Sequence, residues 1–199
     1  MAYQGLPFKD GHFSGAHQIP GKILCAYYDA GGEGVAYHDS DAVNHGSGEL
    51  NPKDGTYLNE FRMGEGVDTS YVKYFSETDN SPYNKVLPPE GHLYIGWTAP
   101  GEWAKYTVNV ATSGTYNVKL LFTSFRGGKA ALSFDDGEAL IGDIPSTFDP
   151  NDPIDWRQHH HWDIVDLGDI LVTEGQHILK LETIENGQIN YAYLEFTLK

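Results

Sequence analysis

Short runs of alternating hydrophobic and polar residues, separated by turn-forming residues, recur along most of this chain. The clearest alternation covers residues 115–123, where positions 116, 118, 120 and 122 are apolar and positions 117, 119 and 123 are polar. A period of two puts one face of a strand against a core and the other face in water. The pattern therefore predicts a strand from a sheet with one buried face.

Similar runs along the chain predict an all-β fold, because they are spaced roughly a dozen residues apart and are separated by Gly-containing turns. The predicted strands cover residues 22–28, 34–37, 57–62, 67–73, 93–97, 103–110, 115–123, 130–134, 162–166, 176–182 and 189–198. Gly and Pro recur too often to leave room for long helices. This pattern is typical of a β-sandwich or a β-barrel.

The sequence predicts one domain behind a short N-terminal segment. Residues 1–21 are rich in Gly, Pro and His and indicate an extended lead-in that wraps around the domain or links it to another, whereas regular structure is expected from Lys22, so the domain spans 22–199. A chain of 199 residues supports a single core. Two long segments, 76–91 and 145–162, interrupt the strand pattern, and loops longer than about 12 residues often carry function.

Composition excludes several classes of function. The 13 Lys and Arg against 28 Asp and Glu give a net charge of −15, which is unsuited to binding a nucleic acid. Cys25 is the only cysteine, so a disulfide framework is excluded. No apolar run approaches the roughly 18 residues of a membrane helix. The first twenty residues also lack the apolar region of a signal peptide.

Local motifs for catalysis are missing: the sequence has no G-x-S-x-G, no H-E-x-x-H and no P-loop. A glycosidase or lyase that uses paired carboxylates needs no local motif, however. Because the chain has 28 acidic residues, a small all-β glycoside hydrolase or lyase remains the alternative from the enzyme class.

Two segments invite a metal-binding interpretation. His159, His160 and His161 are consecutive, but successive side chains of an extended segment point to opposite faces, so at most the first and third could share an ion. Residues 149–155 contain three Asp and one Asn, yet two prolines break their spacing and the Gly and distal Glu of a calcium loop are missing. Neither segment predicts a metal site.

Five segments, taken in order, carry a resemblance to a known family. They are YDAGGEGVAYHD at 28–39, FRMGEGVD at 61–68, IGWT at 95–98, GEWAKYTV at 101–108, and YLEF at 193–196 with Asn190 just before it. Together they span most of residues 20–198. The chain resembles family 6 carbohydrate-binding modules, of the type appended to bacterial polysaccharide-degrading enzymes.

The resemblance implies a jelly-roll β-sandwich of two antiparallel sheets. It also implies a non-catalytic function: binding of a β-linked polysaccharide, or its oligosaccharides, in an aromatic-lined cleft between loops at one end. Such a module targets an attached glycoside hydrolase to its substrate, so we expect it to be secreted as part of a larger protein.

The resemblance assigns sugar contacts to particular side chains. Glu33 matches a glutamate that contacts hydroxyls, and Asn190 matches the asparagine of the C-terminal loop. One aromatic wall falls on Phe61, where the family has tyrosine, or on nearby Tyr57. The opposite wall falls on Trp156. On pattern alone, Glu33 could instead cap a turn, and Asn190 could satisfy backbone groups.

The remaining tryptophans, Trp97, Trp103 and Trp162, are expected in the core. Aromatic walls suit a sugar because a pyranose ring has an apolar C–H face, while short polar side chains suit its rim of hydroxyls. With one or two sugars bound, we expect a Kd of roughly 10 µM to 1 mM. The net charge of −15 favours neutral glycans over acidic ones.

The family's structural calcium is expected to be lost. The positions of its acidic ligands are occupied here by Leu24, Ala26 and Ala192, which offer no side-chain oxygen. We therefore predict no cofactor and apolar packing of Leu24, while weak calcium binding elsewhere stays open. A third function, an adhesion module that binds protein, would require an exposed apolar patch.

Overall fold

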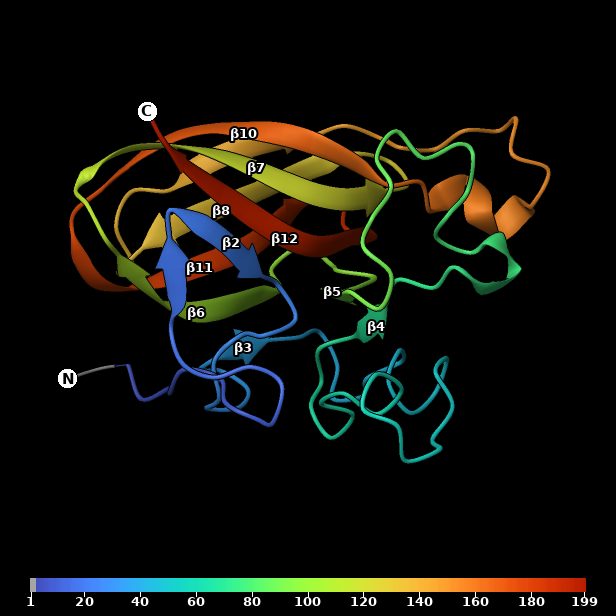
Figure 1. Ribbon diagram of the computed structural model, residues 1–199, viewed down its shortest axis with the longest axis horizontal. Coiled ribbons are helices and arrows are strands. Elements are labelled where there is room, and N and C mark those ends of the chain that lie inside the picture. Colours follow the sequence, from blue (N-terminus) through green and yellow to red (C-terminus); the bar gives the residue numbers. More distant parts are fainter. Residues whose placement is uncertain (1–2) are drawn as a thin grey trace.

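The computed structural model describes residues 3–199 and places them in two sheets that face each other (Figure 1). The first sheet has the order β1 (His17–Ile19), β6 (Trp103–Val110), β11 (Gly175–Glu185), β8 (Gly128–Phe134) and β9 (Leu140–Ile144), and β3 (Tyr37–His38) also pairs with β6. The second has the order β10 (Asp163–Val172), β7 (Gly114–Ser124), β12 (Ile189–Leu198), β5 (Leu93–Ile95) and β4 (Thr69–Tyr71), and β2 (Gly21–Leu24) also pairs with β12.

This architecture confirms the predicted all-β sandwich. Every pairing between these strands is antiparallel except β1 with β6, which is parallel. The alternation in β7 also behaves as predicted, because Tyr116, Val118, Leu120 and Phe122 are all fully buried in the core between the sheets. None of the helices within residues 3–199 has the length and hydropathy of a membrane span.

The opposite face of the second sheet is covered as well. Leu121 points away from the central core and packs with Trp162, Tyr94 and Val72 in a second apolar cluster. Trp162 is fully buried, as expected from the sequence. The segments after β4 and before β10 therefore lie over the sheet and complete its packing.

Residues 57–62 form turns, although the sequence predicts a strand there. The side chain of Asp54 accepts hydrogen bonds from the backbone N–H of Thr56 and from the amide of Asn59, and such local bonds favour a turn over a ladder. A short strand at the sheet edge, β9, was absent from the prediction; its central Gly142 obscures the alternation.

The N-terminal segment is more closely integrated than the sequence indicates. The first strand begins at His17, not at Lys22, because β1 pairs with β6 inside the first sheet. Further upstream, the backbone of Leu6 pairs with that of Ala30 in both directions, at 2.8 Å each. The lead-in therefore wraps against the sandwich and contributes a strand to it.

The two long segments, 76–91 and 145–162, lie side by side at one end of the sandwich, in green and orange in Figure 1. The backbone N–H groups of Lys85 and Val86 both donate to the carbonyl of Trp162. The Tyr83 hydroxyl donates to the carbonyl of Asn151 at 2.8 Å. A short 3₁₀ helix, Phe75–Glu77, spans the start of the first segment. A second one, Asp155–His159, lies within the second segment.

A buried ion pair holds the second segment in shape. Arg157 and Asp152 are 2 % and 1 % exposed, and the guanidinium makes two hydrogen bonds to the carboxylate, at 2.6 and 2.9 Å. The Arg157 guanidinium holds the pKa of Asp152 well below its usual value. Arg157 also donates to the carbonyl of Glu77, which ties the second segment to the first.

We predict that Arg157→Met destabilises the fold by about 3–5 kcal/mol, because it removes the guanidinium that pairs with the buried Asp152 carboxylate. Urea unfolding measures this loss, and Arg126→Met, at an exposed arginine, serves as the matched control. The double variant Asp152→Asn/Arg157→Met should recover part of the loss. Equal stability of Arg157→Met and wild type would contradict the structural role of the pair.

Candidate ligand-binding cleft

One large cleft, of about 1090 Å³, opens at the end of the sandwich where the two long segments lie. Aromatic rings form much of its lining: Tyr71, Phe75, Tyr94, Trp97, Phe125 and Trp156. Tyr71 and Tyr94 lie in β4 and β5, Trp97 and Phe125 follow β5 and β7, and Phe75 and Trp156 lie in the two short 3₁₀ helices. The cleft is therefore built from strand ends and loops at one end of the sheets.

Three of these rings are unusually exposed for large apolar side chains. Phe75 is 61 % exposed, Trp156 is 54 % exposed and Trp97 is 44 % exposed. Exposed aromatic rings gathered around one concavity are typical of a binding surface, because each can bury apolar area against a ligand. The sequence predicts Trp156 as one wall of a sugar-binding cleft, and the structure places its side chain in the lining of this cleft.

Trp97 corrects the sequence-based expectation that it belongs to the core. Strand β5 ends at Ile95, and Trp97 has a backbone φ of 48°, in the left-handed region. Its N–H donates to the side-chain Oδ1 of Asn190 at 3.0 Å. This contact with a residue far away in sequence fixes an unusual backbone conformation next to the cleft, and residue order alone gives no sign of it.

Asn190 lines the same cleft but uses its amide mainly inside the protein. Its Oδ1 accepts from Trp97, and its Nδ2 donates to the Thr123 hydroxyl at 2.7 Å and to Nδ1 of His160 at 3.0 Å. The Nε2 of His160 in turn donates to Asp79 at 2.6 Å. Both amide protons of Asn190 are thus occupied, so it positions Trp97 and His160 at the cleft and has only its oxygen left for a ligand.

The other predicted contact residues lie outside this cleft. Tyr57 and Phe61 line a separate hollow of about 290 Å³ next to the N-terminal segment. Phe61 is only 3 % exposed and packs against Phe8, so it has little surface to offer a sugar. Tyr57 donates its hydroxyl proton to Asp10 and stacks on His12 with ring centroids 3.8 Å apart.

Glu33 also lies away from the cleft lining, in a turn that it stabilises. Its carboxylate contacts Nδ1 of His38 at 2.5 Å and accepts the backbone N–H of Asp39 at 3.0 Å. Glu33 therefore holds the loop between residues 33 and 39. This is the turn-capping alternative that its sequence position left open.

The fold matches solved carbohydrate-binding modules. A β-1,3-glucan-binding family 6 module from Bacillus halodurans aligns over 91 % of this chain and 98 % of its own length, with a TM-score of 0.53 and 15 % identity. The chain has the fold of a family 6 carbohydrate-binding module. This confirms, at the level of fold, the resemblance found in the sequence.

Other solved structures align less well. A module from Cellvibrio mixtus lichenase 5A, in complex with cellotriose, covers 67 % of this chain and 88 % of its own length, with 18 % identity and a TM-score of 0.47. A mannanase from Podospora anserina that carries a family 35 module aligns over 66 % of this chain, at 11 % identity and a TM-score of 0.45, and the match spans only 24 % of the mannanase. No protein-family model and no curated protein matches the sequence.

The three consecutive histidines of this module-like fold have separate partners. His159 packs against Phe125 and Phe148, His160 contacts Asp79, and His161 contacts the buried Asp152. In the part of the chain that the structure describes, no group of three or more His, Cys, Asp or Glu side chains is arranged to hold a metal ion.

The positions at which the family holds calcium are apolar in three dimensions too. Leu24 packs against the cluster that contains Ala192, and the N–H of Cys25 donates to the carbonyl of Ala192 at 3.0 Å. Ala26 is fully buried in a separate cluster with Phe61. Leu24 thus has the apolar surroundings that its sequence position predicts.

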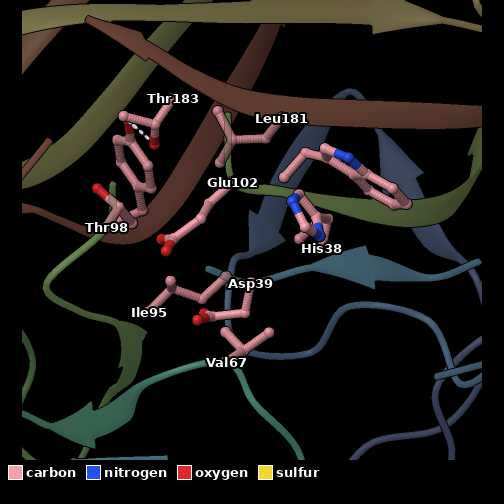
Figure 2. A pocket seen from close by; sticks show the side chains of 11 residues that line it. His38, Asp39, Val67, Ile95, Thr98, Glu102, Leu181 and Thr183 are labelled. Atoms are coloured by element: carbon pink, nitrogen blue, oxygen red, sulfur yellow. Dashed lines mark hydrogen bonds between the residues drawn. The ribbon is translucent and has the colours of Figure 1, made fainter. Parts of the chain in front are cut away.

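A third and much smaller cavity, of about 20 Å³, lies beside β3 and β6, and half-buried Trp103 is part of its lining. Figure 2 shows the carboxylates of Asp39 and Glu102 pointing toward it, with Ile95 and Val67 beside them. Glu102 accepts the backbone N–H groups of Ser40 and Ala99, so it joins two loops. Burial, together with the charges of Glu102 and Asp68, raises the pKa of Asp39 from 3.8 to about 7.

A raised pKa means that the folded state disfavours the Asp39 carboxylate, so this residue costs stability as the pH rises from about 4 to 7. We predict that Asp39→Asn has a higher Tm than wild type at pH 8, and that the difference disappears at pH 4. Thermal unfolding across this pH range measures it. Asp41→Asn is the control, and its effect on stability should have the opposite sign, because the hydrogen bond from the Val43 N–H lowers the pKa of Asp41. A gain in the Tm of Asp39→Asn that does not depend on pH would contradict the prediction.

Proposed function

We propose that this chain is a non-catalytic carbohydrate-binding module that binds a β-linked polysaccharide or its oligosaccharides in the large cleft. The observation that carries the proposal is the set of exposed aromatic rings, Phe75, Trp97 and Trp156, around one loop-end concavity. Each ring can stack on the apolar face of a pyranose, while the amides and hydroxyls between them suit its hydroxyl groups.

The distribution of carboxylates argues against the alternative, a glycoside hydrolase or lyase. Hydrolysis by paired carboxylates needs two acids that flank a bound sugar. Among the described residues that line the large cleft, none is Asp or Glu. Asp39 and Glu102 come together at the small cavity, but about 20 Å³ is room for roughly one water molecule and not for a sugar ring.

The proposal extends to biological context by analogy with the structural neighbours. The Bacillus halodurans module binds β-1,3-glucan, and the Podospora anserina mannanase combines a catalytic domain with a binding module. We propose that this chain likewise targets an attached or associated glycoside hydrolase to its substrate and is secreted as part of a larger protein. A single weak site suffices for this task, because the linkage holds the enzyme near its polymer.

We also propose that sugar binding needs no calcium, since Leu24, Ala26 and Ala192 occupy the positions of the family's ligands. EDTA should leave the affinity unchanged. A loss of binding in EDTA that is restored by added calcium would refute this part of the proposal.

Trp156→Ala and Trp97→Ala should each weaken binding by roughly 30-fold or more, about 2 kcal/mol, because each removes an aromatic wall from the cleft. Affinity electrophoresis against laminarin, glucomannan and xylan, followed by calorimetry, measures the effect.

Tyr57→Ala is the matched aromatic control, because Tyr57 lines the separate hollow and should leave binding intact. If Tyr57→Ala abolishes binding and the two tryptophan variants do not, the site lies at the hollow and the cleft is the wrong assignment. Release of reducing ends from any of these polymers would favour the hydrolase alternative.

A further inference from the structure

The charge of the cleft differs from that of the protein as a whole. The chain carries −15 overall, yet the described residues that line the cleft include no carboxylate and one lysine, Lys73. His159 and His160 are the other titratable nitrogen-containing side chains in the lining. The cleft is therefore a local exception on a strongly acidic molecule.

Lys73 is held in place by neutral groups. Its ammonium donates to Oδ1 of Asn51 and to the Ser70 hydroxyl, and it lies 4.6 Å from the centre of the Tyr71 ring. Within residues 3–199, no carboxylate oxygen lies within 4.0 Å of this ammonium, whereas Lys85 and Lys129 both make such ion pairs. Two of its three protons have protein acceptors, which leaves one for a ligand.

Asp79 is the carboxylate whose charge acts on the Lys73 ammonium, but its oxygens have other hydrogen-bond partners. Its two oxygens accept hydrogen bonds from His160, Trp162 and the backbone N–H of Lys73. Burial lowers the pKa of the Lys73 ammonium, and the charge of Asp79 only partly opposes this. The protein groups around Lys73 thus do not fully compensate its charge.

We propose that the cleft binds a glycan in which one sugar carries a negative group, a carboxylate or a sulfate ester, and that Lys73 pairs with this group. The inference rests on the proposed function and specifies its ligand class. Neighbouring sugars stack on Trp97 and Trp156, while Asn51 and Ser70 hold the ammonium in position. A charged hydrogen bond of this kind is stronger than one between neutral groups.

This ligand class differs from the neutral glycans that the net charge favours. Repulsion by the net charge and pairing with Lys73 act over different distances. Repulsion between an acidic protein and an acidic polymer is screened beyond about 8 Å at physiological ionic strength, whereas a partly buried ion pair is screened much less. Short oligosaccharides at physiological ionic strength therefore report the contact in the cleft with little influence from the rest of the surface.

The test compares chemically matched ligands by calorimetry. Glucuronoxylan oligosaccharides are used before and after reduction of their carboxyl groups, and carrageenan oligosaccharides before and after removal of sulfate; laminarin oligosaccharides serve as the neutral reference. Wild type should bind at least one charged form about tenfold or more tightly than its neutral counterpart. The two pairs distinguish a carboxylate from a sulfate ester.

Variants assign the preference to Lys73. Lys73→Gln should abolish the preference for the charged ligand, and Lys73→Arg should retain most of this preference because the positive charge persists. The control Lys119→Gln, at an exposed lysine on β7, should leave the preference unchanged. Circular dichroism confirms that each variant is folded.

Equal binding of the charged and neutral forms, or a preference that survives Lys73→Gln, would overturn the inference. Binding of laminarin oligosaccharides alone would also overturn it and would leave the proposed function standing. If wild type binds none of these sugars and none of the polymers, the proposed function fails and the inference fails with it.

Discussion

The Asp79 carboxylate connects the parts of the chain that form the cleft. The residue is 1 % exposed, and burial alone would raise its pKa, but hydrogen bonds from His160, the Lys73 backbone and the Trp162 indole lower it. A buried carboxylate needs such donors, because an unsatisfied charge in the interior is very costly. Those donors come from the segment after β4 and from the segment before β10, so the two must lie together for Asp79 to be satisfied.

The same network extends from the interior to the ligand-facing surface. His160 accepts from the amide of Asn190 while it donates to Asp79, and Asn190 in turn accepts from the backbone of Trp97. Since the ionised Asp79 can only accept hydrogen bonds, the proton of His160 is placed on Nε2. Nδ1 of His160 is then the acceptor for the amide of Asn190. The position of the exposed Trp97 ring therefore depends on a carboxylate in the interior. Rigid placement of an aromatic wall lowers the entropy lost when a sugar binds.

The sequence predicts the fold closely, and it predicts the lining of the large cleft only in part. Strand periodicity identifies the long strands β6, β7, β11 and β12 because their side chains alternate between a core and an exposed or separately packed face. The prediction at 57–62 is wrong because local hydrogen bonds from Asp54 favour a turn. At the site, Trp156 and Asn190 lie in the cleft, whereas Glu33, Tyr57 and Phe61 do not. Trp97 and Lys73 also line the cleft, and their positions follow from tertiary contacts that leave no periodic pattern in the sequence.

The location of Phe61 shows how the fold determines which aromatic rings remain exposed. Its aromatic ring is retained, yet Phe8 from the N-terminal segment packs against it at a centroid distance of 5.7 Å and removes it from solvent. That segment is held in place by β1, which pairs inside the first sheet, so the burial of Phe61 is part of the fold. With this side of the sandwich closed, the exposed aromatic side chains in the lining of the large cleft are Phe75, Trp97 and Trp156. All three rings come from segments whose positions depend on Asp79 or Asn190. The proposed binding surface therefore lies where the long segments are ordered by buried polar contacts.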